Sequence, residues 1–283
     1  MGVRLPVAAG SLRVGPYTVE GQSHHYLFRV HRLRVGSSLV LFDGAGAEAD
    51  ARVREVSGDR AVLEVAAPRR VQTAARCQLT LMPALIKGER MDLCVQKLVE
   101  LGVAAIVPMQ TARAVVKLSP ERAARRHQRY RDIATDAARQ SGRAELPTIH
   151  AVTDFARALA WPALAPSAPD EASPPPSPNP AEASGGDAPA ALKLIAAVDP
   201  DSQPLAALLR APLPARACVA VGPEGGFTPA ERARARAAGF TAVSLGPNIL
   251  RAETAAIAIA AGFLLAPGQA DAGGDQRRDD DRQ

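Results

Sequence analysis

Residues 221–229 read Val-Gly-Pro-Glu-Gly-Gly-Phe-Thr-Pro, and residues 245–254 read Leu-Gly-Pro-Asn-Ile-Leu-Arg-Ala-Glu-Thr. Each stretch has a Gly-Pro turn close after a short apolar run that is typical of a buried strand. Thr228 and Glu231 have the spacing of a capping box, and Pro229 suits the first position of a helix. We therefore predict a strand, a glycine loop, a helix and a second strand, followed by a second glycine loop.

Both glycine loops follow the carboxyl end of a predicted strand, which is where ligands bind in open α/β sheets. Glycine lets the backbone approach a ligand closely, and each loop carries one charged residue that could act on it, Glu224 or Arg251. Neither loop has the lysine of a phosphate-binding loop or a Gly-x-Gly-x-x-Gly pattern. The alternative of two ordinary strand-to-helix turns stays open at this point.

The rest of the chain divides into two patterns. Residues 1–74 contain β-like runs at 17–20, 38–42, 50–56 and 60–65, separated by turn residues, which predicts a small barrel or a compact antiparallel sheet. After this region, strands at 79–86 and 104–109 alternate with helices at 87–101 and 119–140. Alternation of this kind favours an α/β domain with a parallel sheet.

Two segments differ in composition from these domains. Residues 162–191 are dominated by Pro, Ala, Ser and Gly, and residues 269–283 are polar and charged. Neither segment can bury enough apolar surface to offset the entropy lost on ordering, so we predict a disordered insertion and a disordered tail.

The charge of the chain favours an anionic partner. The formal net charge is +5, but the insertion and the tail carry −4 and −2, so the remaining residues carry +11. Four arginines of the predicted helix at 119–140 gather within two turns, at positions 122, 125, 126 and 129. RNA would be attracted by such a surplus; an arginine-rich surface that only contacts solvent is the alternative.

Cysteine usage argues against metal and disulfide sites. The three cysteines, Cys77, Cys94 and Cys218, are far apart and form no Cys-x-x-Cys pair, which fits a reducing cytoplasm. The longest apolar stretch, residues 255–266, is too short to span a bilayer. We therefore expect a cytoplasmic protein with no metal and no membrane partner.

The paired glycine loops closely resemble those of the RsmE family of 16S rRNA (uracil-N3)-methyltransferases. Further stretches that resemble this family lie at residues 24–36, 87–91, 96–103 and 137–143. The resemblance implies an N-terminal PUA-like small β-barrel that binds RNA, at 1–74, and a C-terminal SPOUT α/β domain with a deep trefoil knot, at 75–268. It also implies S-adenosyl-L-methionine as methyl donor, 16S rRNA of the small ribosomal subunit as partner, and a homodimer.

The resemblance assigns three groups of residues. Residues expected to bind the donor are Ala197, Gly222, Pro223, Gly225, Leu245, Gly246, Pro247, Ile249, Leu250 and Thr254. Residues expected to contact RNA are Arg29, Arg32, Arg34, Arg113 and Gln140. Residues expected to act on the uracil are Glu224, Arg143 and Arg251.

Methylation at N3 has its own chemical requirements. N3 lies on the pairing edge of uracil, so the base must be unpaired or extruded before it reacts. Rate would come from alignment of donor and acceptor, and from charge that stabilises the developing anion. Glu224 is our hypothesis for the base; a capping or loop-bracing role is its alternative. A SPOUT enzyme acting on transfer RNA or a ribose 2'-hydroxyl, and a non-catalytic rRNA-binding or assembly protein, are the other functions considered.

Overall fold

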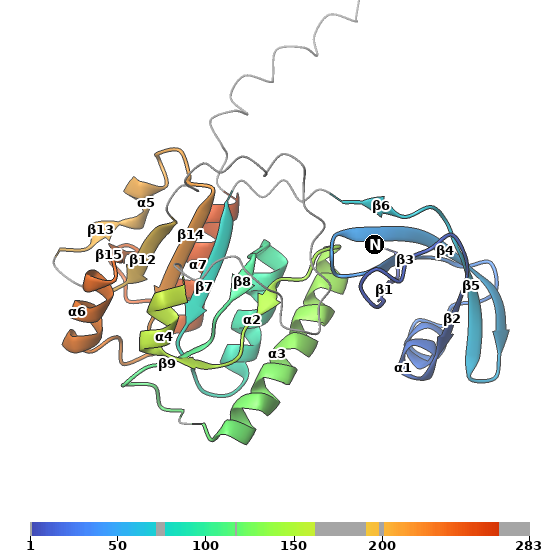
Figure 1. The fold of residues 1–283 in the computed structure, drawn as a ribbon, viewed down its shortest axis with the longest axis horizontal. Coiled ribbons are helices and arrows are strands. Elements are labelled where there is room, and N and C mark those ends of the chain that lie inside the picture. The colour runs from blue at the N-terminus through green and yellow to red at the C-terminus, as the bar shows by residue number, and fades with distance from the viewer. Residues whose placement is uncertain (1, 72–76, 117, 162–190, 198–200, 266–283) are drawn as a thin grey trace, which may run out of the picture. The chain divides into compact units, whose positions relative to one another are not determined.

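The computed structural model describes most of the chain in two units (Figure 1). The residues described are 2–71, 77–116, 118–161, 191–197 and 201–265. Unit 1 comprises residues 2–71 and 131–147, and unit 2 comprises the other described residues. The predicted insertion, apart from residue 191, the predicted tail and the predicted boundary at 74/75 lie outside the described residues, so these remain predictions.

Unit 1 is built on a six-stranded sheet with the order β1-β3-β4-β5-β2, and β6 also pairs with β4. β1 runs parallel to β3, and the other pairs are antiparallel. The elements of this unit before residue 72 are β1 (Arg4–Pro6), β2 (Gly15–Glu20), α1 (Gly21–His24), the π-helix η1 (His25–Val30), β3 (Ser38–Phe42), β4 (Ala47–Ser57), β5 (Arg60–Val65) and β6 (Arg69–Arg70).

The predicted strands of unit 1 all form. The strands at 38–42 and 60–65 have the predicted bounds, and the other two are longer than predicted. Buried and exposed residues alternate along much of β4, as expected for a sheet with one covered face. The covered face packs into a core with Leu27 of η1, which is fully buried.

Unit 2 is built on a seven-stranded sheet with the order β10-β8-β7-β14-β12-β15-β13, in which all pairs are parallel. A separate parallel pair joins β9 to β11. The strands are β7 (Gln78–Pro83), β8 (Ala105–Ile106), β9 (Met109–Gln110), β10 (Thr148–Ile149), β11 (Thr153–Asp154), β12 (Leu192–Ala196), β13 (Gln203–Pro204), β14 (Arg216–Val221) and β15 (Thr241–Ser244).

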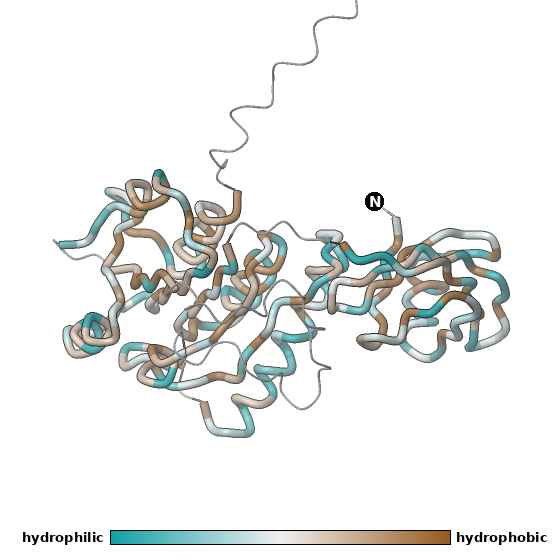
Figure 2. Tube along the Cα trace, turned by 45° about the horizontal axis from the view of Figure 1, so that its top comes forward, coloured by the Kyte–Doolittle hydropathy of each residue, from teal (hydrophilic) through white to brown (hydrophobic). Residues whose placement is uncertain are grey.

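Helices cover both faces of this sheet. The helices after residue 77 are α2 (Glu89–Leu101), α3 (Pro120–Ser141, of which residues 131–141 belong to unit 1), α4 (Phe155–Ala160), α5 (Leu205–Leu208), α6 (Pro229–Ala237) and α7 (Ala252–Leu265). One core cluster joins alternate residues of β7, β12 and β14 to α4 and α6. α7 packs against β7, β14 and α2. Apolar residues line the central strands, as expected for a parallel sheet covered on both faces (Figure 2).

Most predicted elements of unit 2 are present. α2 and α3 agree with their predicted ranges to within two residues, and α2 ends at Gly102, whose φ of 102° is left-handed. The single strand predicted at 104–109 is wrong, because the structure has two short strands, β8 and β9, with Pro108 between them. Proline has no N–H to continue a ladder, and β9 pairs with β11 instead of extending the main sheet.

The chain crosses the sheet between β15 and α7. β15 lies beyond β12, whereas α7 packs against β7 and β14 on the other side of β12. Residues 245–251, which contain the second glycine loop, make this return.

Candidate active site

The two glycine loops lie at the same edge of the sheet in unit 2. β14 ends at Val221 and β15 at Ser244, and both run parallel to β12, which lies between them. The carboxyl ends of these strands therefore meet at one edge, where residues 222–228 and 245–251 begin. Ala197 follows β12 at this edge, and its N–H donates to the carbonyl of Val243.

The first glycine loop is tightly packed. The N–H of Gly226 donates to the carbonyl of Pro223 at 2.8 Å, which closes a turn. A Cβ added at Gly222 would lie 3.1 Å from a ring carbon of Phe227, so the backbone passes close to that ring. Phe227 is buried and packs against Phe155 with 5.3 Å between ring centroids.

The predicted capping box at the start of α6 is confirmed. The Thr228 hydroxyl accepts from the N–H of Glu231, and the Glu231 carboxylate accepts from the N–H of Thr228 at 2.8 Å. The other carboxylate oxygen, Oε1, accepts from the N–H of Ala112 at 2.8 Å. Glu231 therefore joins the first glycine loop to the loop after β9, a role that its spacing alone did not predict.

Arg113, a predicted RNA ligand, contacts the same glycine loop. Its Nη1 donates to the carbonyl of Gly225 at 2.9 Å, and a Cβ added at Gly225 would lie 3.3 Å from the Cβ of Arg113. The Arg113 side chain itself is exposed. Among the described residues, Thr111 in this loop is buried and its hydroxyl has no hydrogen-bond partner.

The second glycine loop is more open. Gly246 has a φ of 118°, which favours glycine, and an added Cβ there would meet nothing within 4 Å. Ile249 is 86% exposed, whereas Leu245 and Leu250 are half-buried. The other predicted site residues of this region, Pro247, Arg251 and Thr254, are exposed.

Glu224, the predicted base, lies in an ion pair. Its Oε1 is 3.4 Å from Nη1 of Arg90, which belongs to the first turn of α2. The Nε of Arg90 lies 3.9 Å from Oε1 of Glu253, in the first turn of α7. Arg90 lies in the stretch 87–91 that resembles the RsmE family, but its sequence context predicted no role for it; its contact with Glu224 spans 134 positions of the chain.

The remaining predicted site residues belong to unit 1. Arg29, Arg32 and Arg34 are exposed, and Arg32 is a non-glycine residue with a left-handed φ of 54°. Gln140, near the end of α3, is exposed as well. Arg143 follows α3, and burial lowers the pKa of its guanidinium, while the charge of Glu145 acts in the opposite direction. The structure thus groups Glu224, Arg113 and Arg251 with the glycine loops in unit 2, and Arg143 and Gln140 with unit 1.

The buried thiols of unit 2 are not activated. Burial raises the pKa of Cys94 to about 12, and the negative charge of Glu253 acts in the same direction. Burial also raises the pKa of Cys218 to about 12 and that of Cys77 to about 11. Protonated thiols are neither nucleophiles nor metal ligands. Within the described part of the chain, no three His, Cys, Asp or Glu residues are grouped to hold a metal ion, and no helix is long and apolar enough to cross a membrane.

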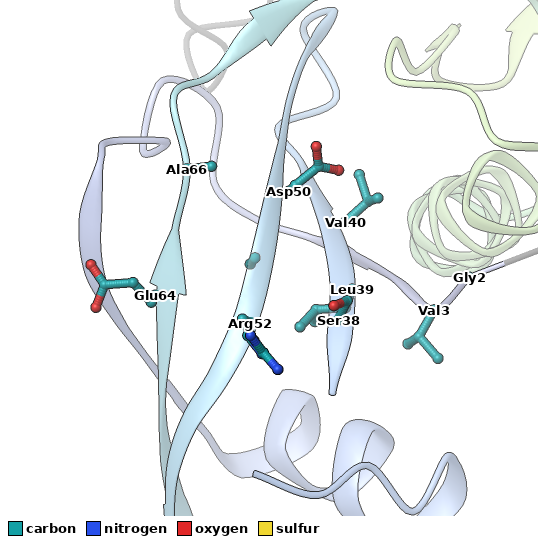
Figure 3. A pocket seen from close by; sticks show the side chains of 10 residues that line it. Gly2, Val3, Ser38, Leu39, Val40, Asp50, Arg52, Glu64 and Ala66 are labelled. Atoms are coloured by element: carbon teal, nitrogen blue, oxygen red, sulfur yellow. The ribbon is translucent and has the colours of Figure 1, made fainter. Parts of the chain in front are cut away.

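A shallow cavity of about 380 Å³ lies on the sheet of unit 1 (Figure 3). Its charged lining residues include Asp50 and Glu64. Both carboxylates already make ion pairs, with Arg69 at 2.7 Å and with Arg54 at 3.2 Å. We assign no ligand to this cavity, because its lining shares no residue with the glycine loops.

Comparison with known proteins identifies the family. A family model described as an RNA methyltransferase domain matches residues 73–263, and one described as an RNA methyltransferase PUA domain matches residues 19–66. The chain is 32% identical over 257 residues to ribosomal RNA small subunit methyltransferase E of Synechocystis sp., which covers 90% of this chain and 75% of that protein. The chain belongs to this RNA methyltransferase family. The resemblance inferred from the glycine loops is therefore confirmed.

Further relatives of this family extend the likeness to solved structures. The protein of the same name from Bacillus subtilis is 28% identical, with 84% of this chain and 86% of that protein covered. The structure of ribosomal RNA small subunit methyltransferase E from Neisseria gonorrhoeae, bound to S-adenosyl methionine, has a TM-score of 0.75 at 32% identity, with 94% and 98% of the two chains covered. A putative methyltransferase from Legionella pneumophila, in complex with the cofactor SAM, has a TM-score of 0.76 at 27% identity, with 93% and 97% covered. The predicted α/β fold with an N-terminal PUA domain thus holds for this member of the family.

Proposed function

We propose that this protein transfers a methyl group from S-adenosyl-L-methionine to N3 of a uridine in 16S rRNA of the small ribosomal subunit. The observation that carries the proposal is the pair of glycine loops at the carboxyl edge of β14 and β15, within the residues that match the RNA methyltransferase domain. The names of the relatives support a ribosomal RNA substrate and this methyl donor.

The glycine loops fit the donor. The backbone at Gly246 faces open space, and Ile249 offers an exposed apolar surface for a purine ring. The donor would supply an electrophilic methyl group on a sulfonium. The residues that would hold it are Ala197, Gly222, Pro223, Gly225, Leu245, Gly246, Pro247, Ile249, Leu250 and Thr254.

The residues proposed to act on the uracil have different surroundings. Arg251 is exposed beside the donor loops and could stabilise the negative charge that develops on the base when N3 loses its proton. Glu224 would accept that proton. Its side chain is 37% exposed and forms an ion pair with Arg90. Arg143, held in unit 1, is proposed to orient the base. If Glu224→Gln keeps full turnover at neutral pH, the assignment of Glu224 as base is wrong.

RNA binding is proposed for exposed cations of both units. Arg29 lies near the end of η1, and Arg32 and Arg34 lie in the segment between η1 and β3. Phosphate contacts from such residues position an RNA without reading its sequence. Gln140 could donate to a carbonyl of the uracil, and Arg113 would contact the RNA beside the first glycine loop.

A homodimer is supported by exposed apolar residues on α2 and α7. α7 is apolar on all sides, which is typical of a helix with no face toward solvent, yet Leu265 is 65% exposed. Leu93 of α2, the helix that packs against α7, is 42% exposed. A second copy of the chain that covers these residues would bury them.

Three further features complete the proposal. The return of the chain from β15 to α7 is where a trefoil knot of the SPOUT class would form, with residues 245–251 in its crossing. The sheet of unit 1 would curve into the PUA-like barrel. With ribosomal RNA as the proposed substrate, the proposed location is the cytoplasm.

The decisive experiment is methyl transfer to small ribosomal subunits from cells that lack this protein. Labelled S-adenosylmethionine is supplied, and the modified nucleoside is mapped by mass spectrometry. We expect 3-methyluridine in 16S rRNA. Label in another nucleoside or in transfer RNA would overturn the uracil-N3 assignment, and RNA binding with no label in any RNA would favour the non-catalytic alternative.

A further inference from the structure

Arg90 lies between carboxylates from both sides of the proposed donor site. Its Nη1 is 3.4 Å from Oε1 of Glu224, in the first glycine loop, and its Nε is 3.9 Å from Oε1 of Glu253, directly after the second loop. A guanidinium can bond to two carboxylates at once, because its N–H groups point in fixed and different directions. One side chain of α2 therefore touches both loop regions.

The two carboxylates differ in how much they need this cation. The Glu224 side chain is 37% exposed, so water can solvate it, whereas the Glu253 side chain is 9% exposed. Oε2 of Glu253 is buried and has no hydrogen-bond partner among the described residues. A buried carboxylate without a cation is costly. Arg90 supplies that charge from an exposed position.

The position of Arg90 on its helix also points to a role in pairing. It occupies the first turn of α2, where the helix dipole disfavours a cation. Glu253, in contrast, occupies the first turn of α7, where the dipole favours a carboxylate. The dipole of α2 therefore does not stabilise the charge of Arg90. The stabilisation comes from the contacts with Glu224 in the first glycine loop and Glu253 in α7.

We propose that Arg90 is a positioning residue that fixes the first glycine loop against the start of α7 and so shapes the donor site. The proposal rests on the donor site assigned above. Arg90 acts through Glu224 and Glu253, and it need not touch the donor or the uracil.

The test is calorimetric binding of S-adenosylmethionine to the full chain without RNA. We expect Arg90→Met to raise Kd about tenfold, or about 1.4 kcal/mol. Arg90→Lys keeps the charge but cannot hold both carboxylates in the same geometry, so it should raise Kd by only about threefold. Lys97→Met is the matched control, because Lys97 lies on the same helix and pairs with Glu100 three residues away; its Kd should stay within about twofold of wild type.

Kinetics separates positioning from a general loss of folded protein. For Arg90→Met, KM for the donor should rise by the same factor as Kd, while KM for the RNA stays within about twofold. A variant that merely folds poorly would bind with the wild-type Kd and fewer sites. If Arg90→Met does not fold, Glu224→Gln at the half-exposed carboxylate takes its place, with an expected rise in Kd of about threefold.

Two results would overturn the proposal. The first is a folded Arg90→Met protein, or its Glu224→Gln substitute, that binds the donor with the wild-type Kd. The second comes from a double-mutant cycle of Arg90→Lys and Glu253→Gln, measured by urea unfolding of the unliganded protein: additive effects would show that the two residues are not coupled. This cycle needs no donor, so it still tests Arg90 if the wild-type protein fails to bind S-adenosylmethionine and the proposed function fails.

Discussion

Glu231→Gln is the substitution that tests most directly how the first glycine loop is held. The Glu231 carboxylate is buried and accepts from three donors, namely the N–H and hydroxyl of Thr228 and the N–H of Ala112. A glutamine has nearly the same size and shape. Its amide, however, offers one acceptor oxygen, and its NH₂ group must face a backbone N–H on the other side.

The expected loss can be worked out from these contacts. If the glutamine oxygen faces Ala112, the N–H of Thr228 loses its acceptor. An unsatisfied buried donor costs about 1 to 3 kcal/mol, and the bond to Ala112 loses its charge assistance. We expect the free energy of unfolding to fall by about 2 to 3 kcal/mol. Because Arg113, next to Ala112, holds Gly225, the glycine loop should loosen, and Kd for S-adenosylmethionine should rise by about fivefold.

Two measurements check this expectation. Urea unfolding gives the stability difference, and hydrogen exchange at the amides of Thr228 and Ala112 reports whether the loss is local. Glu55→Gln is the matched control, because Glu55 is exposed on β4 and should change stability by less than about 0.5 kcal/mol. Unchanged stability together with unchanged protection of both amides in Glu231→Gln would refute the reasoning.

Three further substitutions or conditions have expected outcomes. Arg32→Gly relieves a left-handed residue, so unfolding by urea should show equal or greater stability, by up to about 1 kcal/mol, while RNA binding weakens and its logarithmic salt slope falls by about one. Glu48→Gln leaves Arg4, whose side chain is 12% exposed, without its ionic partner at 2.9 Å, and thermal unfolding should show a loss of about 2 to 3 kcal/mol. Cys94 and Cys218 have a pKa of about 12 in the folded protein, so between pH 9 and 12 they lose their protons in the unfolded chain but keep them in the folded one. Urea titrations should therefore show that the free energy of unfolding falls by up to about 1.4 kcal/mol per thiol and pH unit.

Each of these outcomes has a control. Arg60→Ala, at an exposed residue of β5, separates the loss of one charge from the backbone effect at Arg32; equal RNA binding by Arg32→Gly and wild type would contradict the contact. Glu20→Gln, at an exposed residue, should leave the melting temperature nearly unchanged, unlike Glu48→Gln. Replacing Cys94 and Cys218 by alanine should reduce the fall of stability above pH 9 and leave the part due to Cys77, whose buried thiol has a pKa of about 11; an unchanged slope would contradict the assignment to Cys94 and Cys218.

The sequence predicted the features that depend on neighbouring residues. Thr228, Pro229 and Glu231 define the start of α6 because a capping box needs only three or four consecutive positions. Gly102 and Gly239 end helices for an equally local reason, since both have the left-handed φ that favours glycine. The positions of the two glycine loops followed from the same kind of pattern.

Short strands and their partners were not predictable in this way. β8, β10, β11 and β13 have two residues each, too few for any alternation of polar and apolar residues to be recognised. They form because a neighbouring strand supplies hydrogen bonds, as β8 does for β10. The prediction of a single strand at 104–109 passed over Pro108, and no local pattern indicated that β9 would pair with β11.

The contacts that hold the candidate site depend on strand order, which no local pattern contains. β7 is the neighbour of β14, so the loop and helix that follow β7 begin at the same edge of the sheet as the first glycine loop. That order brings Arg90 to Glu224 across 134 positions, and the Glu231 carboxylate to Ala112 across 119. A residue that the sequence describes only by its charge or its helix preference can therefore take part in the site because the strand order brings its partners to it. Arg90 is the clearest example, because a cation at the first turn of α2 opposes the helix dipole and makes physical sense only beside two carboxylates from other elements.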